Sequence, residues 1–213
     1  MVVKGFTQVP GIDFNETYAL VTCLESICAI LHIGATKDWD IDHLDVKTTF
    51  LHGELDKEIY MEQPEGAKEP GKEDWVCCLN KSLYGLCQAS QQWSKKLHNC
   101  LTKEGFTCCA AEHSIFTRTN DLGMAIIAVH VDDMPVTASS PSAMSSAKAA
   151  LRKYFNIVDL GPVKWLLGIC IERNRPNRTI ALSQTAYIDT IVTRFKLQDS
   201  FKVGTPMDTS VIL

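Results

Sequence analysis

The chain has 213 residues, of which 46% are hydrophobic and 22% charged, so it has the composition of a globular protein with one large domain or two small ones. Its formal net charge of −4 at pH 7 argues against a protein that holds a polyanion by charge alone. No apolar run reaches transmembrane length and no signal peptide begins the chain, so we expect no membrane association and an intracellular location.

The nine cysteines have neither the Cys-x-x-Cys spacing of a zinc site nor the context of a disulfide framework. Their number is odd, and two pairs are directly adjacent. The sequence therefore predicts free thiols at Cys23, Cys28, Cys77, Cys78, Cys87, Cys100, Cys108, Cys109 and Cys170.

Helical and strand-like segments alternate in the first half of the chain. A capping-box pattern at Thr22–Glu25 followed by apolar residues at helical spacing predicts a helix over 23–37. A short helical or turn segment is expected over 48–55, and the stretch 64–74, rich in Pro, Gly and charge, predicts an exposed loop. Strands or extended segments are expected at 39–46, 58–63 and 75–80.

The second half continues this alternation. A helix is expected from Ser90, its cap, to Gly105, and another opens at Ser142. Residues 185–195 predict a last helix. Strands are expected at 113–118, 124–131 and 134–138, and in a hairpin of 163–172 with 179–184. Strands interspersed with helices on one face indicate an α+β domain with an antiparallel sheet backed by helices.

The stretch AIIAVHVDDMPV, residues 125–136, places Asp132 and Asp133 inside an apolar, β-branched run. Asp tolerates tight hairpin turns, so one interpretation is simply a turn between two strands. The apolar flanks favour another interpretation, in which both carboxylates are ligands of a hard cation such as Mg²⁺.

A second acidic stretch, DIDHLDVKTTF, covers residues 40–50. On a strand, Asp40 and Asp42 share one face, while Asp45 lies on the other with Ile41 and His43. Solvated acids near a strand end are one interpretation. If Asp45 converges with Asp132, the pair gains weight as a phosphoryl-transfer site with two metal ions.

Several long blocks, in order, resemble the reverse transcriptase of copia-type (pseudovirus) LTR retrotransposons. They are LDVKTTFLHGELDKEIYMEQPEG, LNKSLYGLCQASQQW, VHVDDM, LGPVKWLLGICIE and LSQTAYIDTIVTRF. The resemblance covers nearly the whole chain and implies a single right-hand polymerase domain over residues 1–213. Partial fingers and palm would occupy roughly 1–140, and the rest of the palm, a primer-grip-like hairpin and a C-terminal helix roughly 141–213.

The resemblance also implies roles for individual residues. Asp45, Asp132 and Asp133 would be the catalytic carboxylates and the ligands of two Mg²⁺ ions, or of Mn²⁺ as a substitute, with Asp45 and Asp132 as the principal ligands. Phe50 and Gln88 would lie near the incoming nucleotide, although Phe50 can equally be a core residue. The implied primer contacts are His130, Met134, Trp165, Leu166 and Gly168, and the last three lie in a hairpin whose apolar residues fit simple packing equally well.

The implied partners are an RNA or DNA template-primer and deoxynucleoside triphosphates, and a parent polyprotein would supply ribonuclease H, integrase and protease. The chain departs from the family pattern where Cys87, Ser90 and Gln91 replace a basic residue, Pro and Arg, and where His130 replaces Tyr. Fewer cations predict weak nucleic-acid binding, and the fingers are expected to be truncated at the N-terminus. We hypothesise that some cysteines arose from arginine codons by cytosine transition.

Three hypotheses follow. The first is an RNA-directed DNA polymerase domain that transfers nucleotides to a primer 3′-hydroxyl. The second is an inactive, decayed remnant with weak or no nucleic-acid binding. The third, a different two-metal phosphotransfer enzyme, fits the carboxylates but not the ordered blocks.

Overall fold

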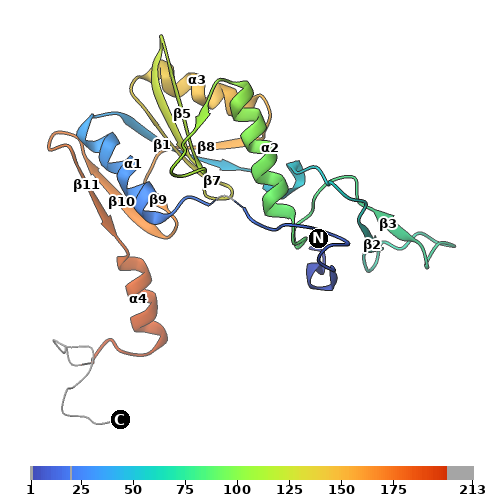
Figure 1. The fold of residues 1–213 in the computed structure, drawn as a ribbon. Coiled ribbons are helices and arrows are strands. Elements are labelled where there is room, and N and C mark those ends of the chain that lie inside the picture. The colour runs from blue at the N-terminus through green and yellow to red at the C-terminus, as the bar shows by residue number, and fades with distance from the viewer. Residues whose placement is uncertain (1, 20, 201–213) are drawn as a thin grey trace.

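The computed structural model describes residues 2–19 and 21–200, so residues 201–213 of the expected C-terminal part lie outside the described residues. Its centre is a six-stranded antiparallel sheet with the strand order β4-β5-β6-β7-β1-β8 (Figure 1). The strands are β1 (Asp40–Val46), β4 (Thr107–Cys108), β5 (Ile115–Asn120), β6 (Gly123–Ala128), β7 (Asp133–Ala138) and β8 (Ile157–Pro162).

Helices α2 (Ala89–Lys103) and α3 (Pro141–Arg152) cover one face of this sheet. Alternate residues of β6 and β7 point toward them, because successive side chains of a strand face opposite ways. The resulting apolar cluster is the largest of the molecule's described part, and its members include Leu44, Trp93, Leu97, Leu101, Phe116, Ile127, Met134, Val136, Met144, Ala147 and Leu151.

Helix α1 (Leu24–Thr36) packs on the opposite face of the sheet. Ile30 of α1 contacts Ile126 and Ala128, the β6 residues that point away from α2 and α3. Gly34 allows a close approach, because a Cβ there would lie 2.4 Å from Cδ1 of Ile41. The central sheet is therefore buried between helices on both faces.

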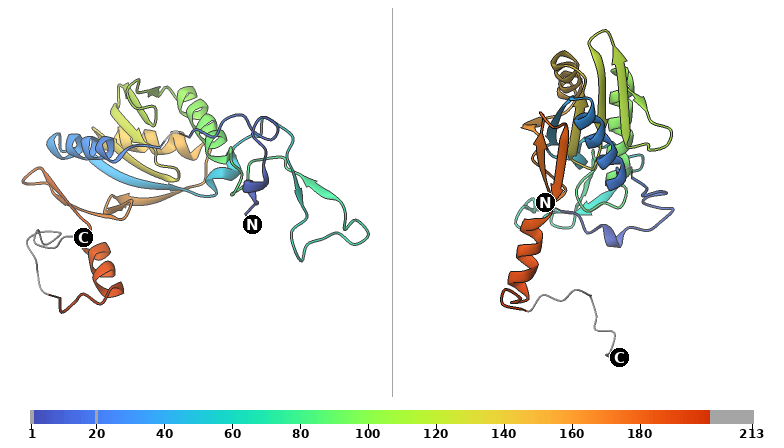
Figure 2. Two further views of the ribbon diagram at one scale, coloured as in Figure 1. Left: turned by 60° about the horizontal axis from the view of Figure 1, so that its bottom comes forward. Right: turned by 90° about the vertical axis from the view of Figure 1, so that its left-hand side faces the viewer.

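A second, three-stranded sheet lies beside α1 and has the order β11-β10-β9. Its strands are β9 (Trp165–Leu166), β10 (Ile169–Asn174) and β11 (Thr179–Ser183). Leu166 and Ile171 of this sheet pack against Ile27 and Leu31 of α1. Helix α4 (Thr185–Arg194) follows, has no buried residue, and stands away from the rest of the described chain (Figures 1 and 2).

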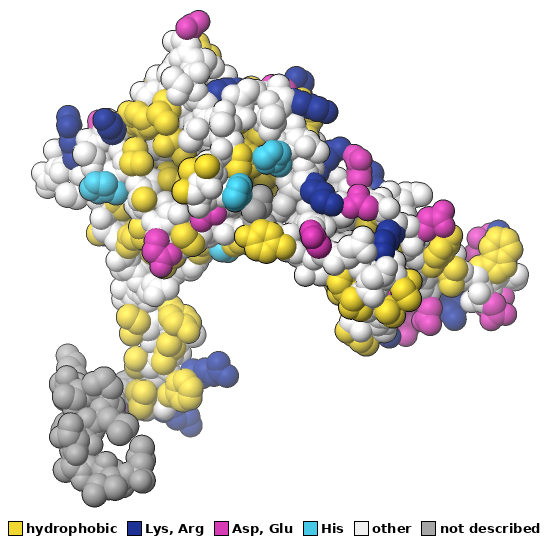
Figure 3. Space-filling model, viewed as in Figure 1, with side chains coloured by type: hydrophobic (Ala, Val, Ile, Leu, Met, Phe, Trp, Pro, Cys, Tyr) yellow, Lys and Arg dark blue, Asp and Glu magenta, His cyan; other side chains and the backbone are white. Residues whose placement is uncertain are grey.

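The N-terminal segment and a small hairpin lie beyond the N-terminal end of α2 (Figure 1). The segment contains the 3₁₀ turn η1 (Gly5–Thr7), and a second 3₁₀ turn, η2 (Thr49–His52), follows β1. The hairpin pairs β2 (Tyr60–Glu62) with β3 (Val76–Cys78) and projects from the opposite side of the molecule to α4 (Figure 2). In the space-filling view the hairpin and α4 form the two ends of an arch (Figure 3).

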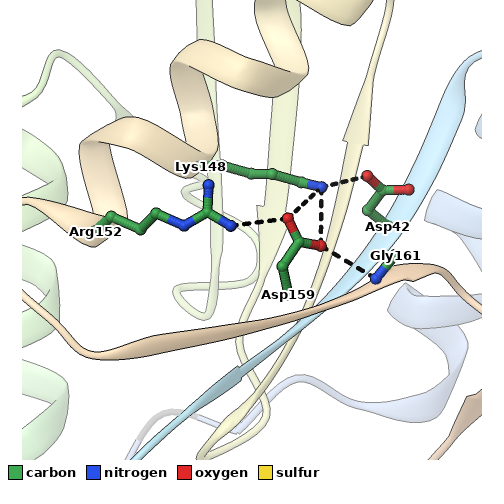
Figure 4. A network of polar contacts seen from close by, with 5 residues as sticks. All are labelled: Asp42, Lys148, Arg152, Asp159 and Gly161. Atoms are coloured by element: carbon green, nitrogen blue, oxygen red, sulfur yellow. Dashed lines mark hydrogen bonds and ion pairs between the residues drawn. The ribbon is translucent and has the colours of Figure 1, made fainter.

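A partly buried ion network joins α3 to β1 and β8 (Figure 4). The Lys148 ammonium on α3 donates to Asp42 on β1 and, at 3.0 and 2.8 Å, to both carboxylate oxygens of Asp159 on β8. Arg152 and the Gly161 backbone N–H also donate to Asp159. The network fixes the edge strand β8 to the helix that covers the sheet.

The α+β class and the antiparallel sheet backed by helices are confirmed, as are most of the predicted elements. The expectation of helices on one face was wrong, because α1 covers the second face. Three predicted helix starts were wrong in detail. Thr22 donates its hydroxyl to Val129 O instead of capping α1, α2 begins at Ala89 before Ser90, and Ser140 rather than Ser142 caps α3 by accepting from Ala143 N–H. Strands β4 and β8 were not predicted.

No helix in residues 2–19 and 21–200 is long and apolar enough to cross a membrane.

Candidate active site

Three acidic residues lie where the end of β1 is next to the start of β7. The antiparallel register places Asp45 of β1 directly opposite Asp133 of β7. Asp132 precedes Asp133 in the tight turn between β6 and β7, which is closed by backbone hydrogen bonds between His130 and Asp133. The fold therefore brings together the two acidic stretches that the sequence singled out.

The turn that carries Asp132 is strained and is held in place from several sides. Val131 has φ of 60°, which is unfavourable for a β-branched residue and costs about 1–3 kcal/mol. Trp93 Nε1–H of α2 donates to Val131 O at 2.9 Å, and Val46 N–H of β1 donates to Asp132 O at 3.0 Å. These bonds determine where Asp132 projects, and its side chain is exposed.

Lys47 lies beside the Asp45 carboxylate. Its Nζ is 2.6 Å from Asp45 Oδ2, an oxygen that is itself buried and has no hydrogen bond of acceptable geometry. The close contact with Asp45 and the negative charges of Asp45 and Asp132 raise the pKa of Lys47. Lys47 therefore stays protonated and is the cation nearest to the carboxylates among the described ion pairs.

His43 holds the third carboxylate. Its Nε2 lies 2.7 Å from Asp133 Oδ1, and the side chain is only 11% exposed. An ionised carboxylate can only accept, so Nε2 carries the proton in this contact. Like charges directly opposite each other on neighbouring strands repel, and His43 and Lys47 each engage one member of the Asp45–Asp133 pair.

The carboxylates fit a hard divalent cation in type and location, because carboxylate oxygens are the preferred ligands of Mg²⁺. Asp45 Oδ2 is buried beside the Lys47 ammonium without a hydrogen bond of acceptable geometry, which supports this fit. In the described ranges, however, no group of three His, Cys, Asp or Glu residues is arranged to hold a metal ion. In this structure His43 contacts Asp133 Oδ1, and Lys47 contacts Asp45 Oδ2.

The two residues expected near a nucleotide lie in well-packed surroundings. Phe50 is half-buried between two apolar clusters, with its ring 4.9 Å from that of Tyr84 in an edge-on arrangement. Gln88 is buried, accepts from Gln8 Nε2–H and donates to Asp13 O. It also lines a polar pocket of about 230 Å³ with residues 13–16, 56–57, 91, 92 and 95.

The expected primer contacts differ in accessibility. Met134 and Leu166 are buried in separate apolar clusters, so their side chains belong to the core. Trp165 is half exposed, and Gly168 turns the chain between β9 and β10 with φ of 77°. His130 is half-buried, with Nδ1 3.1 Å from Thr22 O.

Sequence reasoning assigned no functional role to His43, Lys47 or Trp93. His43 lies two residues before Asp45, and Lys47 two residues after it, and this spacing is the signal that could have identified them. Nothing local in the sequence connects Trp93 with the turn at Val131, because 38 positions separate the two residues.

Comparison with known proteins supplies the family. A family model described as reverse transcriptase (RNA-dependent DNA polymerase) matches residues 1–209. The chain is 41% identical over 208 residues to the retrovirus-related Pol polyprotein from transposon TNT 1-94 of Nicotiana tabacum, covering 97% of the chain and 16% of that protein. No solved structure matches.

Two further relatives extend this comparison. The Pol polyprotein from transposon RE1 of Arabidopsis thaliana is 33% identical over 99% of the chain and 14% of its own length. A putative transposon Ty5-1 protein of Saccharomyces cerevisiae is 35% identical over 78% of the chain and 54% of its own length. The chain thus spans about a sixth or less of the plant polyproteins that it matches.

Proposed function

Since the chain belongs to the reverse transcriptase (RNA-dependent DNA polymerase) family, we propose that it is the palm and part of the fingers of a template-directed polymerase. The observation that carries the proposal is the position of Asp45 directly opposite Asp133, with Asp132 in the adjoining turn. Members of this family generally use divalent metal ions. The relatives are parts of Pol polyproteins, which supports a polyprotein context for this domain.

In this proposal Asp45 and Asp132 are the principal metal ligands and Asp133 is more peripheral. Two bound Mg²⁺ ions, or Mn²⁺ in their place, would activate the primer 3′-hydroxyl and neutralise the triphosphate. The strained turn at Val131, held by Trp93, orients Asp132, and the pairing with β7 orients Asp45. Lys47 can leave Asp45 for solvent, because its side chain is 54% exposed.

The remaining assignments follow the same proposal. The central sheet is the palm, and the N-terminal segment with the β2–β3 hairpin belongs to the fingers. Phe50 and Gln88 lie on the nucleotide side, while His130, Trp165 and Gly168 are the accessible positions for contact with a primer. Met134 and Leu166 would support these positions from the core. A template-primer and deoxynucleoside triphosphates are the substrates, and the parent polyprotein supplies ribonuclease H, integrase and protease.

A second candidate is an inactive remnant with weak nucleic-acid binding. This candidate is supported by the ion pairs that the chain's own lysines and arginines form. Carboxylates engage the side chains of Lys148, Arg152, Arg173 and Arg175, and Lys47 pairs with Asp45. A cation paired within the protein releases fewer counterions from a polynucleotide, so affinity falls.

Primer extension at low salt separates the two candidates. The full chain is incubated with a template-primer, deoxynucleoside triphosphates and Mg²⁺, in parallel with Asp132→Asn, which keeps the size of the side chain and removes its charge. Extension by the unaltered chain that the substitution abolishes supports the polymerase. No extension with excess protein, while circular dichroism shows a folded chain, supports the remnant.

A further inference from the structure

His43 is a buried polar side chain that forms a hydrogen bond with Asp133. It lies on β1, two residues before Asp45, and its backbone pairs with Pro135 rather than with Asp133. The ring reaches diagonally across the two strands to place Nε2 2.7 Å from Asp133 Oδ1. Side chains at diagonal positions can make such contacts when one of them is long.

The strand register shows toward which end of β1 the Asp133 carboxylate is held. Asp45 lies opposite Asp133, whereas His43 lies further along β1, away from the turn that carries Asp132. The hydrogen bond therefore draws the Asp133 carboxylate away from Asp132 and Lys47 and along the sheet. Without it, Asp133 is free to rotate toward the other two carboxylates.

We propose that His43 is a positioning residue that holds the Asp133 carboxylate out of the metal-binding cluster and leaves Asp45 and Asp132 as the pair that binds the ions. The inference rests on the proposed polymerase function. It assigns a role to a histidine within the second acidic stretch. His43 would keep Asp133 apart from Asp45, although the β1–β7 register places these two carboxylates directly opposite each other.

The expected consequences can be measured on binding and on turnover. In His43→Leu, which removes the donor but keeps an apolar side chain of similar size, Asp133 joins the cluster. An additional carboxylate tightens divalent binding, so the Kd for Mn²⁺ falls about tenfold. Misplacement of the ions lowers kcat by about 10- to 100-fold, while KM for the nucleotide stays unchanged.

The experiment compares four variants of the full chain. They are His43→Leu, His43→Gln, the double variant His43→Leu with Asp133→Asn, and His32→Gln. Glutamine can return an N–H donor near the position of Nε2. The control residue His32 forms a hydrogen bond with Thr36 of the same helix and lies on the exposed side of α1. Mn²⁺ binding is measured by calorimetry, turnover by primer extension, and folding by thermal unfolding.

The inference is supported if His43→Leu binds Mn²⁺ more tightly, His43→Gln restores the original Kd, and the change disappears when Asp133→Asn is also present. It is overturned if His43→Leu is folded and binds Mn²⁺ with the original Kd, even if its turnover falls. Absence of extension by every variant, with the Asp133-dependent change in Mn²⁺ binding intact, counts against the polymerase function alone. Extension by the original chain with no effect of His43→Leu counts against the inference alone.

Discussion

Asp42 and Asp45 lie three residues apart on the same strand and have opposite surroundings. Asp42 points toward α3, where it and Asp159 face the two cations Lys148 and Arg152. Asp45 lies at the end of the strand, where it, Asp132 and Asp133 face one cation, Lys47, and the His43 ring. The first region is balanced in charge, whereas the second has an excess of negative charge.

This difference separates a structural carboxylate from a candidate catalytic one. A balanced, partly buried network contributes to stability because each charge has a hydrogen-bonded partner. Removing one partner leaves another charge without its counter-ion. An excess of carboxylates opposes folding by mutual repulsion and is relieved by a bound cation. The comparison predicts opposite effects of substitution in the two regions.

The largest expected effect is on activity, from Asp45→Asn. If the polymerase proposal holds, loss of this ligand lowers the rate of primer extension by about 10³-fold, or about 4 kcal/mol. The free energy of unfolding should stay the same or rise, because the repulsion of Asp133 is removed. Asp42→Asn is the matched substitution on the same strand, and it should lower stability and leave a measurable rate. Equal loss of stability in both variants would contradict the comparison.

The next effect is on stability, from Lys148→Met. The Lys148 side chain is 12% exposed, and its ammonium neutralises both Asp42 and Asp159. Its removal should therefore lower the free energy of unfolding by about 3 kcal/mol. Urea denaturation followed by circular dichroism measures the change.

Arg152→Met is the control for this substitution. The Arg152 side chain is 49% exposed and, within residues 2–19 and 21–200, donates only to Asp159, so we expect a loss of less than about 1 kcal/mol. Similar losses in the two variants would mean that burial of the network has no special importance.

A smaller effect is expected from Trp93→Phe, which keeps an aromatic ring in the core and removes the donor to Val131 O. Loss of one hydrogen bond to a buried helix side chain costs about 1 kcal/mol of stability. Since the bond also holds the turn of Asp132, the rate of extension should fall by more than the stability change explains. A variant with the original rate would show that β1 alone fixes the turn through Val46 N–H.

The sequence predicted the strand and the side-chain orientation around Asp45, but it did not predict strand β8, which supplies a partner to the network around Asp42. Alternation along 40–46 correctly placed Asp45 with His43 on the face away from Asp42. Strand β8 was missed because IVDLGP contains Gly161 and Pro162, which favour turns, and it becomes a strand only by pairing with β1.

Long-range contacts explain the other failures. Thr22 has the sequence context of a helix cap, yet its hydroxyl donates to Val129, 107 positions away, and this contact cannot be inferred from local sequence. In the same way, the partners of Asp42 come from α3 and β8. Residue type and spacing therefore identified the acidic stretches, but only the tertiary structure shows which carboxylates are neutralised.

The smallest expected effect is the dependence of stability on pH. Burial disfavours the ionised form of Asp159, but hydrogen bonds from Lys148 and Gly161 N–H outweigh burial and hold the pKa of Asp159 below its ordinary value of 3.8. Burial likewise opposes the charge of Lys148, and the hydrogen bonds to Asp159 and Asp42 still raise its pKa above 10.5.

Because the pKa of Asp159 is lowered and that of Lys148 is raised, the network stabilises the fold most between pH 3.8 and pH 10.5. A carboxyl group whose pKa is lower in the folded chain contributes stability above pH 3.8 that is lost as the pH falls through its folded value. An ammonium whose pKa is raised contributes stability below pH 10.5 that is lost as the pH rises through its folded value. Urea denaturation at a series of pH values should therefore show stability declining at both extremes, and Lys148→Met should decline less steeply than the original chain at both. Parallel curves would place the titrating groups outside the network and remove the contrast between Asp42 and Asp45.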